Sequence, residues 1–401
     1  MKSLSNGNLK HLFNKTWFMT LLYTSFFASM QLTNWRPIRY WNLRGEGTNF
    51  IDTEQVLNWT KCYKNVGDQI FQAEGFCSGY IYGKIIPVLF TVIPSNDYLV
   101  STVGYVFLLM IAIVLGATTA SLSTMQTKLF SAIVFISPPV LLLVERGNFD
   151  AVMVGLVFLA AIMLNQNRKL FSFAFISLAS LIKFYTLPLL LIFIFENSRK
   201  KINYIYLPGV FLVSFLVYEG IRNIKSSFPT DSTYKFGMSI WIRYLPAERI
   251  PFNVELLANL VGLIIFVLVA VVMSIAYKSK IWSSSNIVVE EDKNNVDFFN
   301  LFFLCHAICF FSGMSYDYRL IFLAVSGIYF LSLKTSSAGV DSLVKVLLVI
   351  SMWLTYPSGG LQPIGDLAIC VITFLLSIEF LKLNSLPFGA KRLMRGDKHD
   401  L

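Results

Sequence analysis

Charged side chains are scarce in this sequence. Asp, Glu, Lys and Arg together make up 14% of the 401 residues, whereas 55% of the residues are hydrophobic. A soluble domain of this size cannot hide so much apolar surface, and long apolar runs recur along the whole chain. The composition therefore predicts an all-α membrane protein that crosses the bilayer many times.

Histidine and the usual cofactor signatures are also scarce. The chain has only three histidines, and none is spaced with cysteines as zinc ligands are. It has no phosphate-binding loop and no dinucleotide fingerprint. We therefore expect no metal and no other cofactor. His306 stands alone in an apolar run, which favours a core position over a ligand role.

The five cysteines fall into two groups. Cys305, Cys309 and Cys370 lie in apolar runs and are expected to be small core residues. Cys62 and Cys77 lie in a polar segment, and a disulfide between them is reasonable if that segment faces an oxidising compartment.

The net charge of +10 is carried largely by short loops. In a soluble protein such a charge suggests nucleic acid, but between apolar runs basic loops set orientation in the bilayer. We therefore expect a lipid bilayer as partner and no nucleic acid. The oligomeric state is left open.

The apolar runs predict one transmembrane domain over 1–401, with about ten full spans. We expect these spans near 17–34, 99–118, 128–144, 150–165, 203–219, 255–276, 298–313, 318–333, 343–356 and 367–382. The run at 170–195 differs, because basic residues flank both of its ends and place both ends in the cytoplasm. We expect a re-entrant helical hairpin there, with Lys183 near its turn and Pro188 limiting the second arm.

Orientation follows from the basic loops. Both termini are expected in the cytoplasm, including the basic tail at 383–401. The extracytoplasmic face then receives two large loops with short helices, 35–98 and 220–254. It also receives the short connections "ERGNFD" (145–150) and "GMSYDYR" (313–319), so the unusual charges gather on one face.

Asp52 opens a helical pattern in the first large loop. It is a plausible N-cap of that helix, with Gln55 three positions later. The alternative is a functional carboxylate, because an ionised Asp can accept a proton from a hydroxyl held against it. Glu54 could compete for that role.

Three cations lie at the predicted outer level, and phosphate is the ligand that they suit. Arg146 follows a span, Lys183 lies near the hairpin turn, and Arg319 opens another span. Structural salt bridges, such as Lys183 with Asp150, are the alternative. Asn148 either caps the next helix or, together with Asp150, contacts a sugar.

Asp317 lies two positions before Arg319, between two tyrosines, Tyr316 and Tyr318. The two tyrosines could cover a sugar ring or a lipid, and Asp317 could contact the sugar or pair with Arg319.

The order of these motifs resembles a known family. The segments "RGNFD", "LIKFYTLPLLL", "FGMSIWIRYL" and "SGMSYDYRLIFLAV", with a "GDQIF" segment after the Asp52 helix, are similar to glycosyltransferases of the GT-C fold, family 87 type. The resemblance spans residues of about 50 to 330. The sequence departs from the family pattern after Lys183, where Thr186 stands in place of an expected proline.

The resemblance implies a reaction. Enzymes of this class move one sugar, with inversion, from a polyprenyl-phosphate donor to a hydroxyl of a glycan or glycolipid acceptor. They act on the extracytoplasmic face of the plasma (inner) membrane without a metal, and the Asp of the first outer loop, here Asp52, is the general base. By analogy the role is in cell-envelope polysaccharide biosynthesis, such as O-antigen modification.

Two other functions compete with this expectation. A transporter or flippase of lipid-linked glycans predicts polar residues through the membrane depth and an internal repeat, and neither is evident. A polysaccharide polymerase would share the outer carboxylate and arginine, and it differs in using a pyrophosphate-linked donor.

Overall fold

The structure is a computed structural model that describes residues 6–33, 35, 50–68, 83, 85–91, 97–196, 203–221, 235–237, 293–311, 315–333, 338–355 and 361–384. The predicted span at 255–276, most of the 220–254 loop and the tail from 385 onward lie outside these residues.

The described residues are almost all helical, as predicted. The elements are α1 (Asn6–Leu32), α2 (Ile51–Val66), α3 (Ile85–Thr91), α4 (Asp97–Ser121), α5 (Met125–Phe135), α6 (Pro138–Arg146), α7 (Asp150–Asn165), α8 (Lys169–Ile182), η4 (Phe184–Leu190), α9 (Leu191–Glu196), α10 (Asn203–Ile221), β1 (Lys235–Phe236), α12 (Lys293–Phe311), β2 (Ser315–Tyr316), η8 (Asp317–Leu320), α13 (Ile321–Ser332), α14 (Ala338–Trp353) and α15 (Gln362–Asn384).

Two of the described helices, α4 over Tyr98–Ser121 and α15, are long and apolar enough to cross a membrane. The bent pair α5 and α6 makes a third if it counts as one span. Other apolar helices have 10–17 residues, and at 1.5 Å per residue they rise about 15–25 Å, short of a ~30 Å hydrocarbon core. Ten full spans are therefore not seen in the described part of the chain.

The span predicted at 128–144 is broken rather than straight. Helix α5 ends at Phe135, α6 begins at Pro138, and the two axes differ by 56°. Two consecutive prolines, Pro138 and Pro139, cause the break. Neither has an N–H to donate to the preceding turn, and Ser137, the residue before Pro138, is forced out of the helical region. Ser137 accordingly has an extended backbone, with φ −72° and ψ 157°.

The chain folds back on itself at Lys183, as expected for the 170–195 segment. Lys183 interrupts the helix with φ −137° and ψ 122°, and a 3-10 helix that contains Pro188 follows. Phe173 and Phe193 lie ten residues to either side of Lys183, and their ring centroids are only 5.5 Å apart. Helices α8 and α9 are therefore the two arms of a hairpin whose apex is Lys183.

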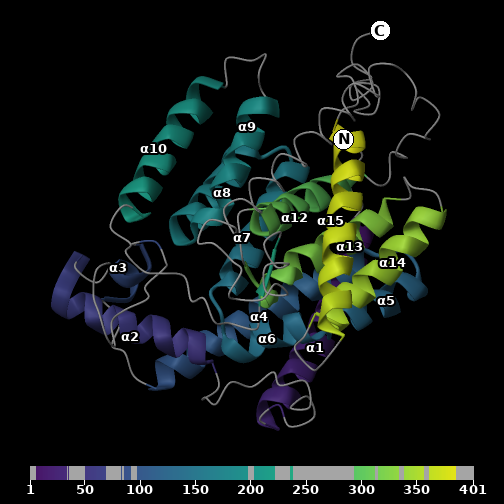
Figure 1. The fold of residues 1–401 in the computed structure, drawn as a ribbon, viewed down its shortest axis with the longest axis horizontal. Coiled ribbons are helices and arrows are strands. Elements are labelled where there is room, and N and C mark those ends of the chain that lie inside the picture. The colour runs from purple at the N-terminus through teal and green to yellow at the C-terminus, as the bar shows by residue number, and fades with distance from the viewer. Residues whose placement is uncertain are drawn as a thin grey trace, which may run out of the picture.

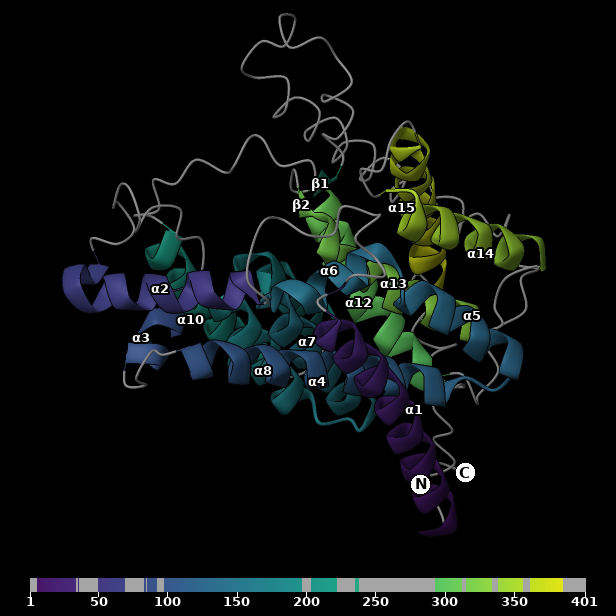
Figure 2. The ribbon, with the colours of Figure 1, turned by 90° about the horizontal axis from the view of Figure 1, so that it is seen from below.

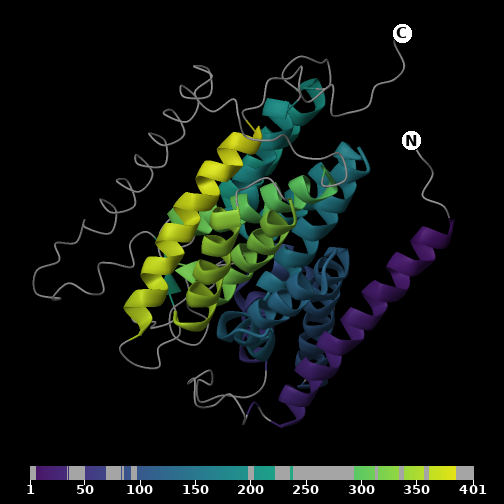
Figure 3. The ribbon, with the colours of Figure 1, turned by 90° about the vertical axis from the view of Figure 1, so that its right-hand side faces the viewer.

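The helices pack in pairs, α1 with α4, α7 with α8, α12 with α13 and α14 with α15. Helices α2 and α3 lie at the end of the molecule opposite α14 and α15 (Figures 1 and 2). The N-terminal part of α1 projects beyond the other helices (Figures 2 and 3). The two-residue strands β1 and β2 pair antiparallel, with Lys235 opposite Tyr316.

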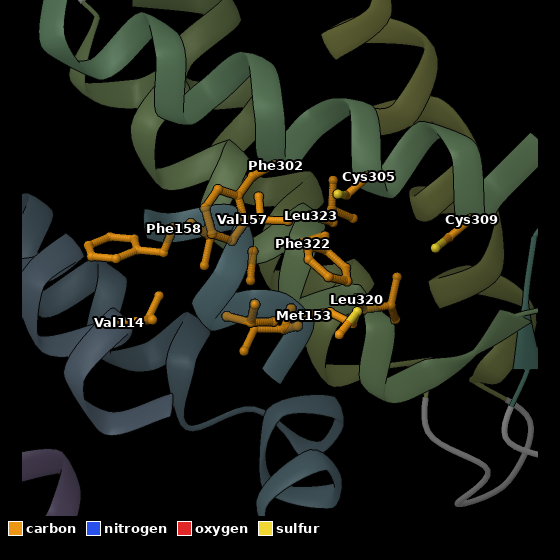
Figure 4. Close-up of a cluster of buried hydrophobic side chains, with 14 of the residues drawn as sticks. Val114, Met153, Val157, Phe158, Phe302, Cys305, Cys309, Leu320, Phe322 and Leu323 are labelled. Atoms are coloured by element: carbon orange, nitrogen blue, oxygen red, sulfur yellow. The ribbon is translucent and has the colours of Figure 1, made fainter. Parts of the chain in front are cut away.

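A dry aromatic core fixes α7 against α12 and α13. Phe158 and Phe298 lie with ring centroids 5.1 Å apart, and Phe298 stacks on Tyr329 at 4.6 Å. Figure 4 shows buried side chains of this core, including Phe158 of α7, Phe302 of α12 and Phe322 of α13. Because this core is close-packed, it holds the first turn of α7 and the η8 turn in fixed positions.

Candidate active site

The connection between α6 and α7 is a tight turn built around Gly147. Gly147 has φ +56° and ψ +47° and ends α6, with its N–H donating to the carbonyls of Leu143 and Val144. Asn148 then accepts the backbone N–H of Asp150 on its Oδ1 at 2.8 Å. This contact satisfies the backbone donor at the start of α7. The N-cap of that helix is Phe149 and no side chain caps it, so the cap by Asn148 that the sequence offered is not seen.

Helix α2 docks onto this turn through its N-terminal end. The N–H of Phe50 donates to the carbonyl of Glu145 at 3.0 Å, and Thr53 Oγ1 donates to the carbonyl of Gly147 at 2.5 Å. A Cβ atom on Gly147 would meet Thr53 Oγ1 at 2.7 Å. Only glycine therefore allows α2 to approach so closely.

Asp52 is not the N-cap of α2. The helix begins at Ile51, its N-cap is Phe50 in the left-handed region, and no side chain caps it. The cap expected at Asp52 is not formed, because the chain enters the helix at Phe50, whose N–H donates to the carbonyl of Glu145. Asp52 therefore lies inside the first turn of α2, where its carboxylate points to another helix.

Both oxygens of Asp52 are engaged by the α6–α7 turn. Arg146 donates to Oδ1 through Nε at 2.9 Å and through Nη2 at 2.5 Å, and Asn148 Nδ2 donates to Oδ2. The Asp52 side chain is 8% exposed, whereas that of Arg146 is 30% exposed. This arrangement orients a carboxylate firmly and keeps it close to the surface.

Asp150 is the second carboxylate, and it is fully buried. Its Oδ1 accepts from Lys183 Nζ at 2.9 Å and from the Tyr185 hydroxyl at 2.6 Å. Its Oδ2 accepts from Arg319 Nε at 3.1 Å. The Arg319 guanidinium also lies over the Tyr185 ring, 4.8 Å from the centroid, in the geometry of a cation–π contact.

Asn148 joins the two carboxylate groups into one network. Its Nδ2 contacts Asp52, and its Oδ1 accepts from Lys183 Nζ at 3.1 Å. The side chains come from α2, from the α6–α7 turn, from the hairpin apex and from η8. Asp52, Arg146, Lys183 and Arg319 therefore converge in space, although they are up to 267 positions apart in sequence (319 − 52).

The three cations of the network differ in exposure. Arg146 and Arg319 are partly exposed and Lys183 is nearly buried, with side-chain exposures of 30%, 15% and 5%. Asp52 and Asp150 pair with these cations, and Glu145 lies within electrostatic reach of Arg146. Arg146 therefore presents the most exposed positive charge of the network.

The remaining predicted site residues lie in and around the network. Glu54 is partly exposed on α2, and Asp317 and Tyr318 are buried in η8. Tyr316 lies in β2, and its side chain is outside what the structure describes. Arg319 binds Asp150 through its Nε.

Two functional contacts were missed by the sequence reasoning. Tyr185 binds Asp150, and Thr53 fixes α2 to the turn. Tyr185 lies two positions after Lys183 in "LIKFYT", and proximity to a candidate cation at a helix break is the signal that could have found it. Thr53 gives no such signal.

The cysteines divide as the sequence suggested. Cys62 of α2 is disulfide-bonded, and its predicted partner Cys77 lies outside the described residues. Cys305, Cys309 and Cys370 are buried thiols. His306 is also buried and bonds to Thr373 Oγ1 at 2.8 Å, which joins α12 to α15. Within the ranges that the structure describes, no three His, Cys, Asp or Glu side chains are grouped as metal ligands.

No family model matches the chain, and no match is found among curated proteins or solved structures.

Proposed function

We propose that the protein is a membrane glycosyltransferase that moves one sugar from a polyprenyl-phosphate donor to a hydroxyl of a glycan or glycolipid. The observation that carries the proposal is the convergence of Asp52 with Arg146, Lys183 and Arg319 in one hydrogen-bonded network. A base beside a group of cations suits a reaction in which a hydroxyl loses a proton while a phosphate gains charge.

The cations serve the leaving group. As the bond from sugar C1 to the phosphate oxygen breaks, negative charge grows on the lipid phosphate. Arg319 uses its Nε for Asp150, and its other N–H groups can donate to phosphate oxygens. Arg146 is the most exposed of the three cations, and Lys183 adds a fixed positive charge behind them.

Asp52 serves the acceptor. The acceptor oxygen attacks C1 on the face opposite the phosphate, and its proton passes to a carboxylate oxygen of Asp52. The C1 configuration inverts, and the products are the glycosylated acceptor and the polyprenyl phosphate. Asp52 later returns the proton to water. In the proposed reaction the charge on the phosphate is met by the three cations, and no step calls for a metal or cofactor.

The apolar helices support a place in the plasma membrane, with the polyprenyl chain of the donor among the lipids. The network lies where chain segments turn, at the α6–α7 connection, the hairpin apex and η8. Charged groups are tolerated at such a level much better than at the bilayer centre. We propose that this level is extracytoplasmic, that both termini are cytoplasmic, and that the product belongs to a cell-envelope polysaccharide.

The test is transfer by the purified protein from a panel of polyprenyl-phosphate sugars, followed by mass analysis of the products. Asp52→Asn keeps the shape of the side chain and removes the base, so we expect transfer to fall about 10²–10⁴-fold. Glu54→Gln makes the same chemical change at the competing candidate two positions along α2, and we expect it to retain transfer; loss of transfer in Glu54→Gln alone would assign the base to Glu54. Normal turnover by Asp52→Asn would remove Asp52 from the mechanism.

A further inference from the structure

The Asn148 amide has only one orientation that fits its surroundings. Its Nδ2 faces the Asp52 carboxylate, and its Oδ1 faces the Lys183 ammonium and the N–H of Asp150. A flipped amide would place oxygen against a carboxylate and NH₂ against two donors. The side chain is 2% exposed, so water does not supply alternative partners.

The amide is also the connection between two separate charge groups. On one side lies the Asp52–Arg146 pair, and on the other lies Asp150 with Lys183 and Arg319. In the described part of the chain, the hydrogen bonds of Asn148 link these groups. A neutral amide suits this position because it donates to an anion at one end and accepts from a cation at the other.

We propose that Asn148 is a positioning residue that couples Asp52 to the Lys183 ammonium, so that an anion bound at the exposed arginines alters the hydrogen bonding of the base. The inference rests on the proposed function, with the donor phosphate as the anion. A phosphate held in front of Lys183 attracts the ammonium and weakens its bond to Asn148 Oδ1. Because linked hydrogen bonds polarise one another, the bond from Nδ2 to Asp52 weakens as well.

The consequence is a base that responds to the donor. A carboxylate that accepts fewer hydrogen bonds holds a proton more readily. Asp52 therefore becomes a better acceptor of the hydroxyl proton once the donor phosphate is in place. The network therefore favours an order in which the donor binds first and Asp52 takes the hydroxyl proton afterwards. Without a bound donor, Asp52 is the weaker base and the acceptor hydroxyl keeps its proton.

Two substitutions separate coupling from simple support. Asn148→Asp still accepts from Lys183 but places a second carboxylate against Asp52, and like charge favours the protonated form of the base. Asn148→Leu has similar bulk and breaks both contacts. Asn148→Ser serves if either variant fails to fold, because a hydroxyl is too short to bridge the two groups.

The first experiment needs no activity. Thermal midpoints in detergent are measured for Asp52→Asn, Lys183→Met and the double variant, in the wild-type and Asn148→Leu backgrounds. We expect the two shifts to be clearly non-additive in the wild type and closer to additive in Asn148→Leu, where only the direct attraction between the two charges remains. Additive shifts in both backgrounds would overturn the coupling.

The second experiment is the pH dependence of kcat/KM for transfer. We expect the acid limb for Asn148→Asp to move upward by about one to three pH units. The control Asn58→Asp adds the same charge to α2, six residues beyond Asp52, and should leave the acid limb in place. An unmoved limb in Asn148→Asp would overturn the positioning role. If no donor yields transfer, the thermal measurement alone decides the coupling, and only the proposed function fails.

Discussion

At the scale of single residues, Asp150 is the counter-ion of two cations. Of the two roles that the sequence left open, the structure shows the salt bridge with Lys183. The carboxylate is 0% exposed, and both of its oxygens are occupied. Lys183 and Arg319 would repel each other without it. The carboxylate thus holds Lys183 and Arg319 close together, and in the proposed function both act on the donor phosphate.

Asp150→Asn tests this role. The variant leaves Lys183 and Arg319 without their buried counter-charge, and removal of one partner from a buried pair costs about 3–5 kcal/mol of unfolding free energy. Adding Lys183→Met to Asp150→Asn should recover part of the loss, because one unpaired cation is removed. The measurement is unfolding of the purified protein in detergent.

The control for this prediction is Asp68→Asn, at an exposed position where the carboxylate accepts an exposed hydrogen bond from Tyr63. It should change the unfolding free energy by no more than about 0.5 kcal/mol. Equal stability of the Asp150 and Asp68 variants would mean that the buried cations do not need a counter-ion.

At the scale of elements, the Gly147 turn aligns the base with its partners, and a matched pair of glycines tests it. Gly67 and Gly147 share a positive φ, +58° and +56°, but their ψ angles differ, −139° and +47°. A Cβ meets nothing within 4 Å at Gly67 and meets Thr53 at 2.7 Å at Gly147. Alanine at Gly67 should therefore cost backbone strain alone, on the order of 1–3 kcal/mol.

Gly147→Ala forces Thr53 and α2 to move. We expect it to lower transfer at least tenfold, since Arg146 and Asn148 flank the glycine and hold Asp52. Gly67→Ala also strains the backbone but should leave transfer intact, because a Cβ there meets nothing within 4 Å. Intact transfer in Gly147→Ala would show that α2 does not depend on close contact with the turn.

Local features at this scale could be predicted from sequence, whereas most contacts between elements could not; the salt bridge of Lys183 with Asp150 is the exception. The "ERGNFD" turn and the reversal at Lys183 follow from glycine, from helix-breaking residues and from basic flanks. The bend at Ser137 was equally visible in "SPP" but was overlooked within an apolar run. The partners of Asp52 were not predictable, because its neighbours at 146 and 148 depend on how α2 docks.

At the scale of the whole molecule, chain direction explains why distant residues meet. Helix α6 ends and α7 begins at the network, the hairpin turns there, and η8 leads into α13 there. Each element contributes only one or two polar side chains, so the apolar helices remain apolar. Such a network at one end of the molecule suits a lipid-borne anion, because the lipid chain can stay in the bilayer while its head reaches the cations.

This arrangement predicts opposite sidedness for the two ends of α7. Gln55 lies on α2 at the network end, and Asn167 lies in the connection between α7 and α8, with both residues exposed. We expect Gln55→Cys to react with a membrane-impermeant maleimide in intact cells, and Asn167→Cys to react only after permeabilisation. The native Cys305, Cys309 and Cys370 are buried, so the unsubstituted protein is the control for background labelling. Labelling of Asn167→Cys from outside, with Gln55→Cys protected, would put the network in the cytoplasm and leave a donor on the outer face without its base.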